Sequence, residues 1–182
     1  MTLNLECVPE RYRPSAQRAF DCGDGAGFIY SAAGAGMTLF ALNLRQLRER
    51  GIYEVALLTA FAGAKANNCC WPLGLLKNWL HAADRAKLLA AGDPLPHPGP
   101  FVLYRGVAGE PANRRPCGIH WTGSFEKAIW FATRFHLPAP AVYKVCVKAE
   151  RVWAHTEYQD EYLVVIRRNG LQRVPWTFEE AA

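Results

Sequence analysis

The sequence lacks the cysteine patterns that accompany zinc sites and disulfide frameworks. Its 182 residues include six cysteines, but none of them forms a Cys-x-x-Cys pair and their spacing is irregular. Cys69 and Cys70 are adjacent and precede Trp71, where unpaired thiols pack like small hydrophobic side chains. We therefore predict no metal site, and we expect the thiols to stay reduced, as in a cytoplasmic protein.

Long apolar runs are also missing. No uncharged apolar stretch approaches the ~18 residues that indicate a transmembrane helix. The first residues show no basic segment followed by an apolar one, which is the pattern of a signal peptide. We expect a cytoplasmic protein with no membrane partner, a class that includes proteins delivered into a host cell or expressed there.

The charged residues form no basic or acidic arm. The net charge is +5, with 10 Lys+Arg against 8 Asp+Glu in residues 1–100 and 11 against 8 in residues 101–182. Such an excess helps an anionic partner to approach, either a dinucleotide or a nucleic acid, but many proteins with neither partner share it. A hydrophobic content of 51% and a charged content of 20% exclude extensive disorder.

Residues 1–100 are predicted to be mainly helical. Pro9, Pro14 and a glycine-rich segment indicate little regular structure in residues 1–35. Apolar residues then recur at helical spacing, which predicts helices over residues 37–50, 53–65, 72–81 and 84–92. Residues 93–100 contain four prolines and are the expected boundary of this helical lobe.

Residues 101–182 are predicted to be rich in strands. Patterns typical of strands occupy residues 101–104, 141–147, 152–154 and 161–167, and residues 176–180 are expected to form a closing strand or tail. One helix is predicted over residues 125–135, with Ser124 as its N-cap. We therefore predict an α+β fold in one domain, residues 1–182, with a helical lobe and a strand-rich region.

Three polar motifs stand where predicted strands begin or end. They are Leu-Tyr-Arg-Gly at 103–106, Gly-Ile-His-Trp-Thr-Gly-Ser at 118–124 and Gln-Asp-Glu at 159–161. Arg105 is suited to a pyrophosphate, and Glu161 is suited to the cation that forms when a ribose loses its base. Alternation along a strand would place Gln159 and Glu161 on one face and Asp160 on the other.

Each motif also has a simpler interpretation. Arg105 could be a surface arginine at a strand end, and helix capping explains Ser124 without any function. Trp121 and Phe131 are aromatic residues of the kind that usually fill a core, although a nicotinamide ring would also need such a face. Glu161 could be a solvated residue at the start of a strand. The three motifs in this order are more informative than any one of them.

Together with the helix that follows the second motif, they resemble the arginine, serine/threonine, glutamate branch of the mono-ADP-ribosyltransferase family over residues 101–166. The resemblance implies a split β-sheet core, NAD as a co-substrate and no metal. It implies that Glu161 is catalytic, with Gln159 beside the acceptor, and that Phe131 or Trp130 stacks on nicotinamide. The NAD-binding residues that it implies are Arg105, Gly106, Trp121, Thr122 and Phe131, with Thr122 also supporting the glutamate.

The expected activity is transfer of ADP-ribose from NAD to a protein or a nucleic acid, as in a toxin or phage-type effector. Gln159 resembles family members that modify asparagine or guanine, and it argues against an arginine acceptor. The second motif departs from the usual Ser-Thr-Ser, because Trp121-Thr122-Gly123 stands there. Two alternatives stay open. The first is an enzyme of the same fold that hydrolyses NAD or modifies a small molecule. The second is a module that binds nucleotides or nucleic acid without catalysis.

Overall fold

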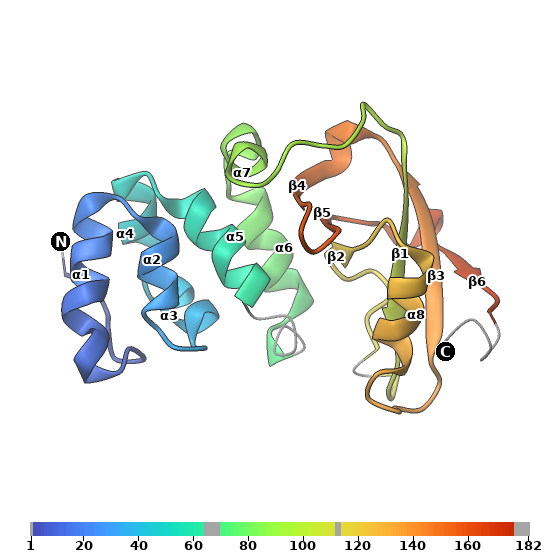
Figure 1. Cartoon of the computed structure of the whole chain (residues 1–182), viewed down its shortest axis with the longest axis horizontal. Coiled ribbons are helices and arrows are strands. Elements are labelled where there is room, and N and C mark those ends of the chain that lie inside the picture. The colour runs from blue at the N-terminus through green and yellow to red at the C-terminus, as the bar shows by residue number, and fades with distance from the viewer. Residues whose placement is uncertain (1, 64–69, 112–113, 177–182) are drawn as a thin grey trace. The chain divides into compact units, whose positions relative to one another are not determined.

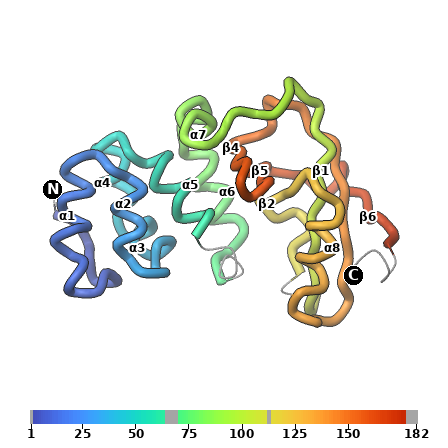
Figure 2. Tube along the Cα trace, viewed as in Figure 1, coloured from blue at the N-terminus to red at the C-terminus, as the bar shows by residue number. Residues whose placement is uncertain are grey.

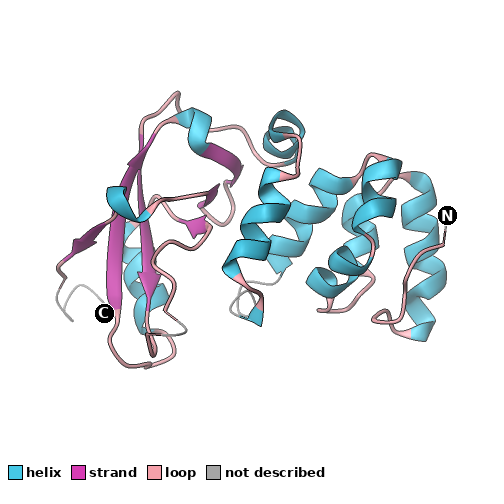
Figure 3. Cartoon of the chain, turned by 180° about the vertical axis from the view of Figure 1, so that it is seen from behind, coloured by secondary structure: helices cyan, strands magenta, loops and turns pink. Residues whose placement is uncertain are grey.

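The chain divides into two compact units, residues Met1–Ala91 and Gly92–Ala182 (Figure 1). The computed structural model describes residues 2–63, 70–111 and 114–176. The first unit is helical, and the second contains two small antiparallel sheets and a helix, so the predicted α+β class is confirmed (Figure 3). Within the described residues, no helix is both long and apolar enough to cross a bilayer.

The first unit is built around helix α5, Tyr53–Gly63. It packs against α2, α3, α4 and α7, and its buried residues are Tyr53, Ala56, Leu57, Leu58, Ala60 and Phe61. Buried Tyr53 also donates from its hydroxyl to the carbonyl of Trp79, at 3.0 Å. The other helices are α1 Arg13–Cys22, α2 Gly25–Tyr30, α3 Gly36–Leu42, α4 Leu44–Arg50, α6 Leu73–His81 and α7 Arg85–Ala91, preceded by the 3₁₀ turn η1 Glu10–Tyr12 (Figure 2).

The expectation of little regular structure in residues 1–35 was wrong. Pro14 lies in the first turn of α1, where its missing N–H costs no hydrogen bond, and Gly23 ends this helix with a φ of 79°. The side chain of Asp24 then caps α2 by accepting from the N–H of Gly27 at 2.8 Å. The prolines and glycines of this segment therefore begin and end helices.

The helix predicted over residues 37–50 is divided at Asn43 into α3 and α4. The Asn43 side chain is buried and donates to the carbonyls of Leu39 and Asn4, at 2.9 and 2.8 Å, while its oxygen accepts from the N–H of Asn4. The two bonds with Asn4, 39 residues away, tie the division between α3 and α4 to the N-terminal segment.

The second unit contains two three-stranded antiparallel sheets. One has the order β1-β3-β6, and the other has the order β2-β5-β4. An isolated bridge between Tyr104 and Thr122 connects β1 to the segment after β2. The bounds are β1 Phe101–Val107, β2 His120–Trp121, β3 Ala141–Val147, β4 Val152–Thr156, β5 Glu161–Val164 and β6 Gln172–Val174, with 3₁₀ turns η3 Ala149–Arg151 and η4 Arg168–Gly170.

The two faces of β1 meet different partners. Phe101 and Leu103 point into a core that they share with Trp121 and Tyr162 of the other sheet. The opposite face is covered by helix α8, Phe125–Thr133, through its apolar residues Ala128, Ile129 and Ala132. Ser124 caps α8 as predicted, since its Oγ accepts from the N–H of Lys127 at 3.0 Å. Of the predicted closing segment, residues 177–180 lie outside the described part of the chain.

Candidate functional site

Arg105 lies on the face of β1 that points toward the shared core. Its Nε donates to the carbonyl of Arg115 at 3.0 Å, and its Nη1 donates to the carbonyl of His120 at 2.5 Å. Gly118 has no room for a Cβ atom, because the guanidinium occupies that space. The residue as a whole is partly exposed, but its charged end is enclosed. Arg105 is thus not a surface arginine at a strand end.

The enclosed guanidinium of Arg105 is a poorly solvated cation. Desolvation lowers its pKa to about 10, and the Glu161 carboxylate opposes this shift. Arg105 therefore stays charged at neutral pH. A cation with little water around it is stabilised by a neighbouring negative charge. The guanidinium of Arg105 should therefore attract an anionic group that reaches it.

Glu161 is held by His120, which sequence reasoning did not assign a role. The His120 Nδ1 lies 2.6 Å from Oε1 of Glu161, and the two side chains are only 16% and 13% exposed. An ionised carboxylate only accepts hydrogen bonds, so Nδ1 carries the proton in this contact. The strand register pairs His120 with Leu163, which places His120 and Glu161 on one face of the β2-β5-β4 sheet.

Thr122 contacts a different carboxylate from the one expected. Its hydroxyl donates to Oδ2 of Asp160, and the N–H of Ser124 donates to the same Asp160 oxygen at 3.1 Å. The N–H of Gly123 donates to the other oxygen at 3.3 Å. Asp160 therefore ties the second motif to the third, while the support of Glu161 comes from His120.

Gln159 and Glu161 do not follow strand alternation, so this expectation was wrong. Residues 157–160 form a turn in which Asp160 has a φ of 41°, and β5 begins only at Glu161. The Gln159 carbonyl accepts from Nζ of Lys127, whereas its side-chain Oε1 is buried without a hydrogen-bond partner among the described residues. Tyr158, at the tip of the turn, is 96% exposed.

The remaining expected NAD-binding residues, Gly106, Trp121 and Phe131, make packing contacts within the fold. Gly106 faces α8, where a Cβ atom would overlap the carbonyl of Ala128. Trp121 is 2% exposed, belongs to the shared core and donates from Nε1 to the carbonyl of Gly118 at 2.8 Å. Phe131 packs edge to face on Trp130 at 5.0 Å between ring centroids. Their implied contacts with NAD stay predictions.

Thr156 is a second residue that the sequence did not single out. The register of β4 and β5 places it opposite Glu161, and its buried Oγ1 has no hydrogen-bond partner in the described ranges. His120 had a signal in the sequence, because it stands two residues before Thr122 in the second motif. Thr156 had none, since it lies outside every motif and reaches Glu161 only through strand pairing.

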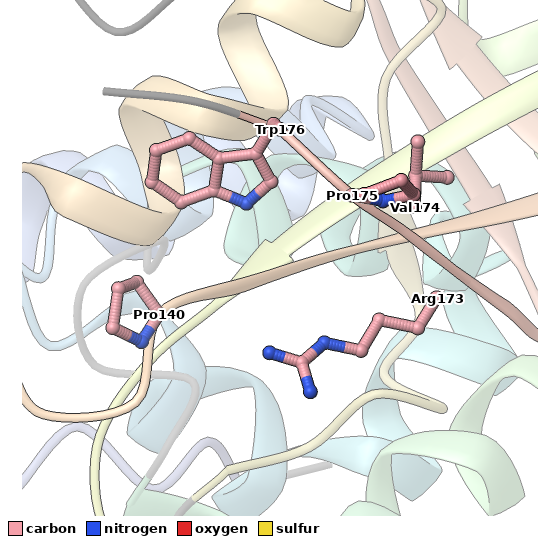
Figure 4. Close-up of a pocket in the computed structure, with 5 residues that line it drawn as sticks. All are labelled: Pro140, Arg173, Val174, Pro175 and Trp176. Atoms are coloured by element: carbon pink, nitrogen blue, oxygen red, sulfur yellow. The ribbon is translucent and has the colours of Figure 1, made fainter.

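A cavity of about 460 Å³ lies elsewhere in the second unit, at the end of edge strand β6. Figure 4 shows its walls, which include the rings of Pro140 and Trp176 and the side chain of Arg173. None of its lining residues belongs to the cluster of Arg105, His120 and Glu161, so this cavity is a separate feature.

The three motifs thus converge on one cluster, in which Arg105, His120 and Glu161 come from β1, β2 and β5. Thr122, Asp160 and Gln159 adjoin it through the turn before β5. Comparisons with models of known protein families, with curated proteins and with solved structures give no match for this chain.

Proposed function

We propose that this chain cleaves NAD between nicotinamide and ribose and transfers the ADP-ribose to a macromolecular acceptor. The observation that carries the proposal is the contact chain from Arg105 through His120 to Glu161. A buried guanidinium and a partly buried carboxylate from separate strands meet there, within one hydrogen-bonded group. Such a pair offers a cation for a pyrophosphate and an anion for an oxocarbenium ion.

Glu161 would stabilise the charge that develops on the ribose. The nicotinamide of NAD is already cationic, so the C–N bond breaks with its electron pair leaving on neutral nicotinamide, and no acid is needed. The acceptor then forms a bond to the ribose carbon and loses a proton. A fixed carboxylate lowers the barrier because it faces positive charge in the transition state. The bond from His120 keeps Glu161 in one orientation.

Arg105 would bind the pyrophosphate. A guanidinium has five N–H donors, and two of those of Arg105 go to backbone carbonyls, which leaves three. In the described part of the chain these three have no acceptor. The two carbonyl bonds fix the plane of the group, so the remaining donors are oriented before a ligand arrives, and less entropy is lost on binding.

The turn before β5 would receive the acceptor. Gln159 and the exposed Tyr158 lie two and three residues before Glu161, in the turn that leads into β5, so an acceptor that approaches the carboxylate from this turn would contact them. The buried Oε1 of Gln159 lacks a donor among the described residues, and an N–H group of the acceptor would satisfy it. This is consistent with the asparagine or guanine acceptors that the resemblance associates with glutamine at this position.

The arrangement of the sheets gives further support. The resemblance implies a split β-sheet core, and the second unit has two three-stranded sheets that a single bridge at Tyr104 and Thr122 connects. Arg105 and Ser124 are each within two residues of this bridge, so a pocket formed there would be lined by the first and second motifs.

The test is incubation of the purified chain with NAD that is labelled in the adenine ring, with and without a cell lysate. Release of nicotinamide with label in protein or nucleic acid is the expected result. Release with free ADP-ribose alone would instead favour the hydrolase alternative. No release by the wild-type chain, together with binding of NAD, would contradict the proposal and favour a binding module. Glu161→Gln is the inactive reference, and Glu150→Gln, which removes an exposed carboxylate, is the matched control.

A further inference from the structure

An aromatic surface follows the end of α8. It consists of Trp130, Phe131, Arg134 and Phe135, and we call it the α8 aromatic surface. Trp130 is 55% exposed and Phe135 is 60% exposed, although Ala128, Ile129 and Ala132 of the same helix are buried against β1. Large exposed aromatic residues cost hydrophobic free energy unless a partner covers them, so such a cluster indicates an interaction site.

Arg134 is the centre of this surface. The carbon of its guanidinium lies 4.9, 4.6 and 4.5 Å from the ring centroids of Trp130, Phe131 and Phe135. A guanidinium stacked on rings keeps its edge available for hydrogen bonds. The rings and the cation therefore form one preorganised group.

Arg134 has no anionic partner within the described residues. Among these residues, no carboxylate forms an ion pair with its guanidinium, no group accepts a hydrogen bond from its side chain, and its Nε is buried without a partner. Desolvation lowers the pKa of its guanidinium. A partly desolvated cation without an acceptor is stabilised by an incoming anion, so the ligand of this surface should carry negative charge.

A second cation lies close to the segment that follows the helix. Nη1 of Arg114 donates to the carbonyl of Ala139 at 3.1 Å, and the N–H of Gly109 donates to the carbonyl of Pro138 at 2.7 Å. These bonds hold Gly109 and Arg114 against residues 138–139. From Lys127 to Arg151 the chain has five basic residues and one acidic residue, Glu150.

We propose that the α8 aromatic surface binds single-stranded nucleic acid. Exposed Trp130 and Phe135 would stack on unpaired bases, and Arg134 with Arg114 would contact the phosphates. A duplex keeps its bases stacked on one another and cannot offer them to these rings. An acidic protein would satisfy the cations but would leave the flat faces of the rings without matching groups.

The position of this surface relates it to the proposed reaction, although the binding does not depend on that reaction. Nζ of Lys127, in the first turn of α8, donates to the carbonyl of Gln159. Arg134 is seven residues further along, about 10 Å at the helical rise of 1.5 Å per residue. A single-stranded nucleic acid bound to the α8 aromatic surface would thus lie about 10 Å along α8 from the residue that contacts the turn before Glu161.

The test is fluorescence anisotropy without NAD, using labelled oligothymidylate and oligouridylate of about 12 nucleotides, their duplexes with complementary strands, and inorganic polyphosphate as competitor. We expect the single strands to bind more tightly than the duplexes. Trp130→Ala and Phe135→Ala should each weaken binding by roughly 5- to 150-fold, the range measured for loss of one stacked base. Arg134→Gln should reduce the slope of log affinity against log salt by about 0.7.

Matched controls are Tyr30→Ala, which removes an exposed ring, and Lys87→Gln, which removes an exposed cation, both in the first unit. Both should bind like the wild type. Equal binding of duplex and single strand, or wild-type affinity in Trp130→Ala and Phe135→Ala, would overturn the proposal. The proposal would also be overturned if sedimentation showed a wild-type dimer that Trp130→Ala and Phe135→Ala dissociate, because the surface would then join two copies of the chain. Glu161→Gln should bind the oligonucleotide normally, which separates this result from failure of the NAD chemistry.

Discussion

Nδ1 of His120 lies 2.6 Å from Oε1 of Glu161, across 41 residues of sequence. The contact forms because β2 and β5 are paired in a register that places both side chains on one face of the sheet. A carboxylate held in this way loses less side-chain entropy when a ligand binds beside it, and this is the advantage of a preorganised site.

Glu161→Gln should abolish most turnover and spare NAD binding. In the proposed reaction the carboxylate stabilises positive charge that is fully developed only in the transition state, so its loss should lower kcat by about 10²- to 10³-fold. The dissociation constant of NAD, measured by calorimetry, should change only a few-fold. Full labelling activity in this variant would remove Glu161 from the reaction.

His120→Ala should lower kcat and leave the KM for NAD nearly unchanged, because in the proposed reaction His120 is a positioning residue for Glu161. Loss of one hydrogen bond to a charged group corresponds to about 1.5–3 kcal/mol, or roughly 10- to 150-fold in rate. His120→Asn retains a donor and should recover part of the activity. If both variants reacted at the wild-type rate, the contact would have only a structural role.

Arg105→Lys should weaken NAD binding by about 1–3 kcal/mol, because an ammonium group keeps the charge but loses the planar donors. The variant should also unfold at lower urea concentration, since the carbonyls of Arg115 and His120 lose their donors. Arg151→Lys, at an exposed position, is the control for both measurements. Unchanged NAD affinity in folded Arg105→Lys would exclude Arg105 from the proposed NAD site.

Gln159→Ala should separate cleavage from transfer. Gln159 lies in the turn before β5, and the hydrogen bond that holds Glu161 comes from His120 instead, so nicotinamide release should continue at a similar rate. Label in macromolecules should fall, because the acceptor loses the amide that would bind it. Equal loss of both activities would show that Gln159 acts on NAD cleavage itself.

Gly106→Ala should destabilise the second unit. The added Cβ would overlap the backbone of Ala128 in α8, and such overpacking costs about 1–3 kcal/mol of unfolding free energy. Gly74→Ala is the contrasting control. It lies in helix α6 with open space around it, so replacement should raise the unfolding free energy by up to about 1 kcal/mol. Urea titration measures both changes, and equal stability of Gly106→Ala and the wild type would contradict this packing.

Local chemistry in the sequence determined most of the elements. The alternating apolar pattern of residues 141–147 became β3 with the same bounds, and Ser124 caps α8 because its hydroxyl needs only the N–H three residues later. Such features depend on near neighbours, and the sequence states them directly. The motifs at Arg105 and Glu161 were visible for the same reason, as polar residues at the ends of apolar runs.

The tertiary structure alone decided which of these residues touch. The pairing of His120 with Glu161, and of Thr122 with Asp160, depends on a strand register that no local pattern specifies. The left-handed Asp160 ended the alternation expected for Gln159, because the turn takes its conformation from bonds to a segment about 36 residues away. Contacts between distant segments form only when the whole unit packs, and for that reason the partners of Glu161 could not be read from the sequence.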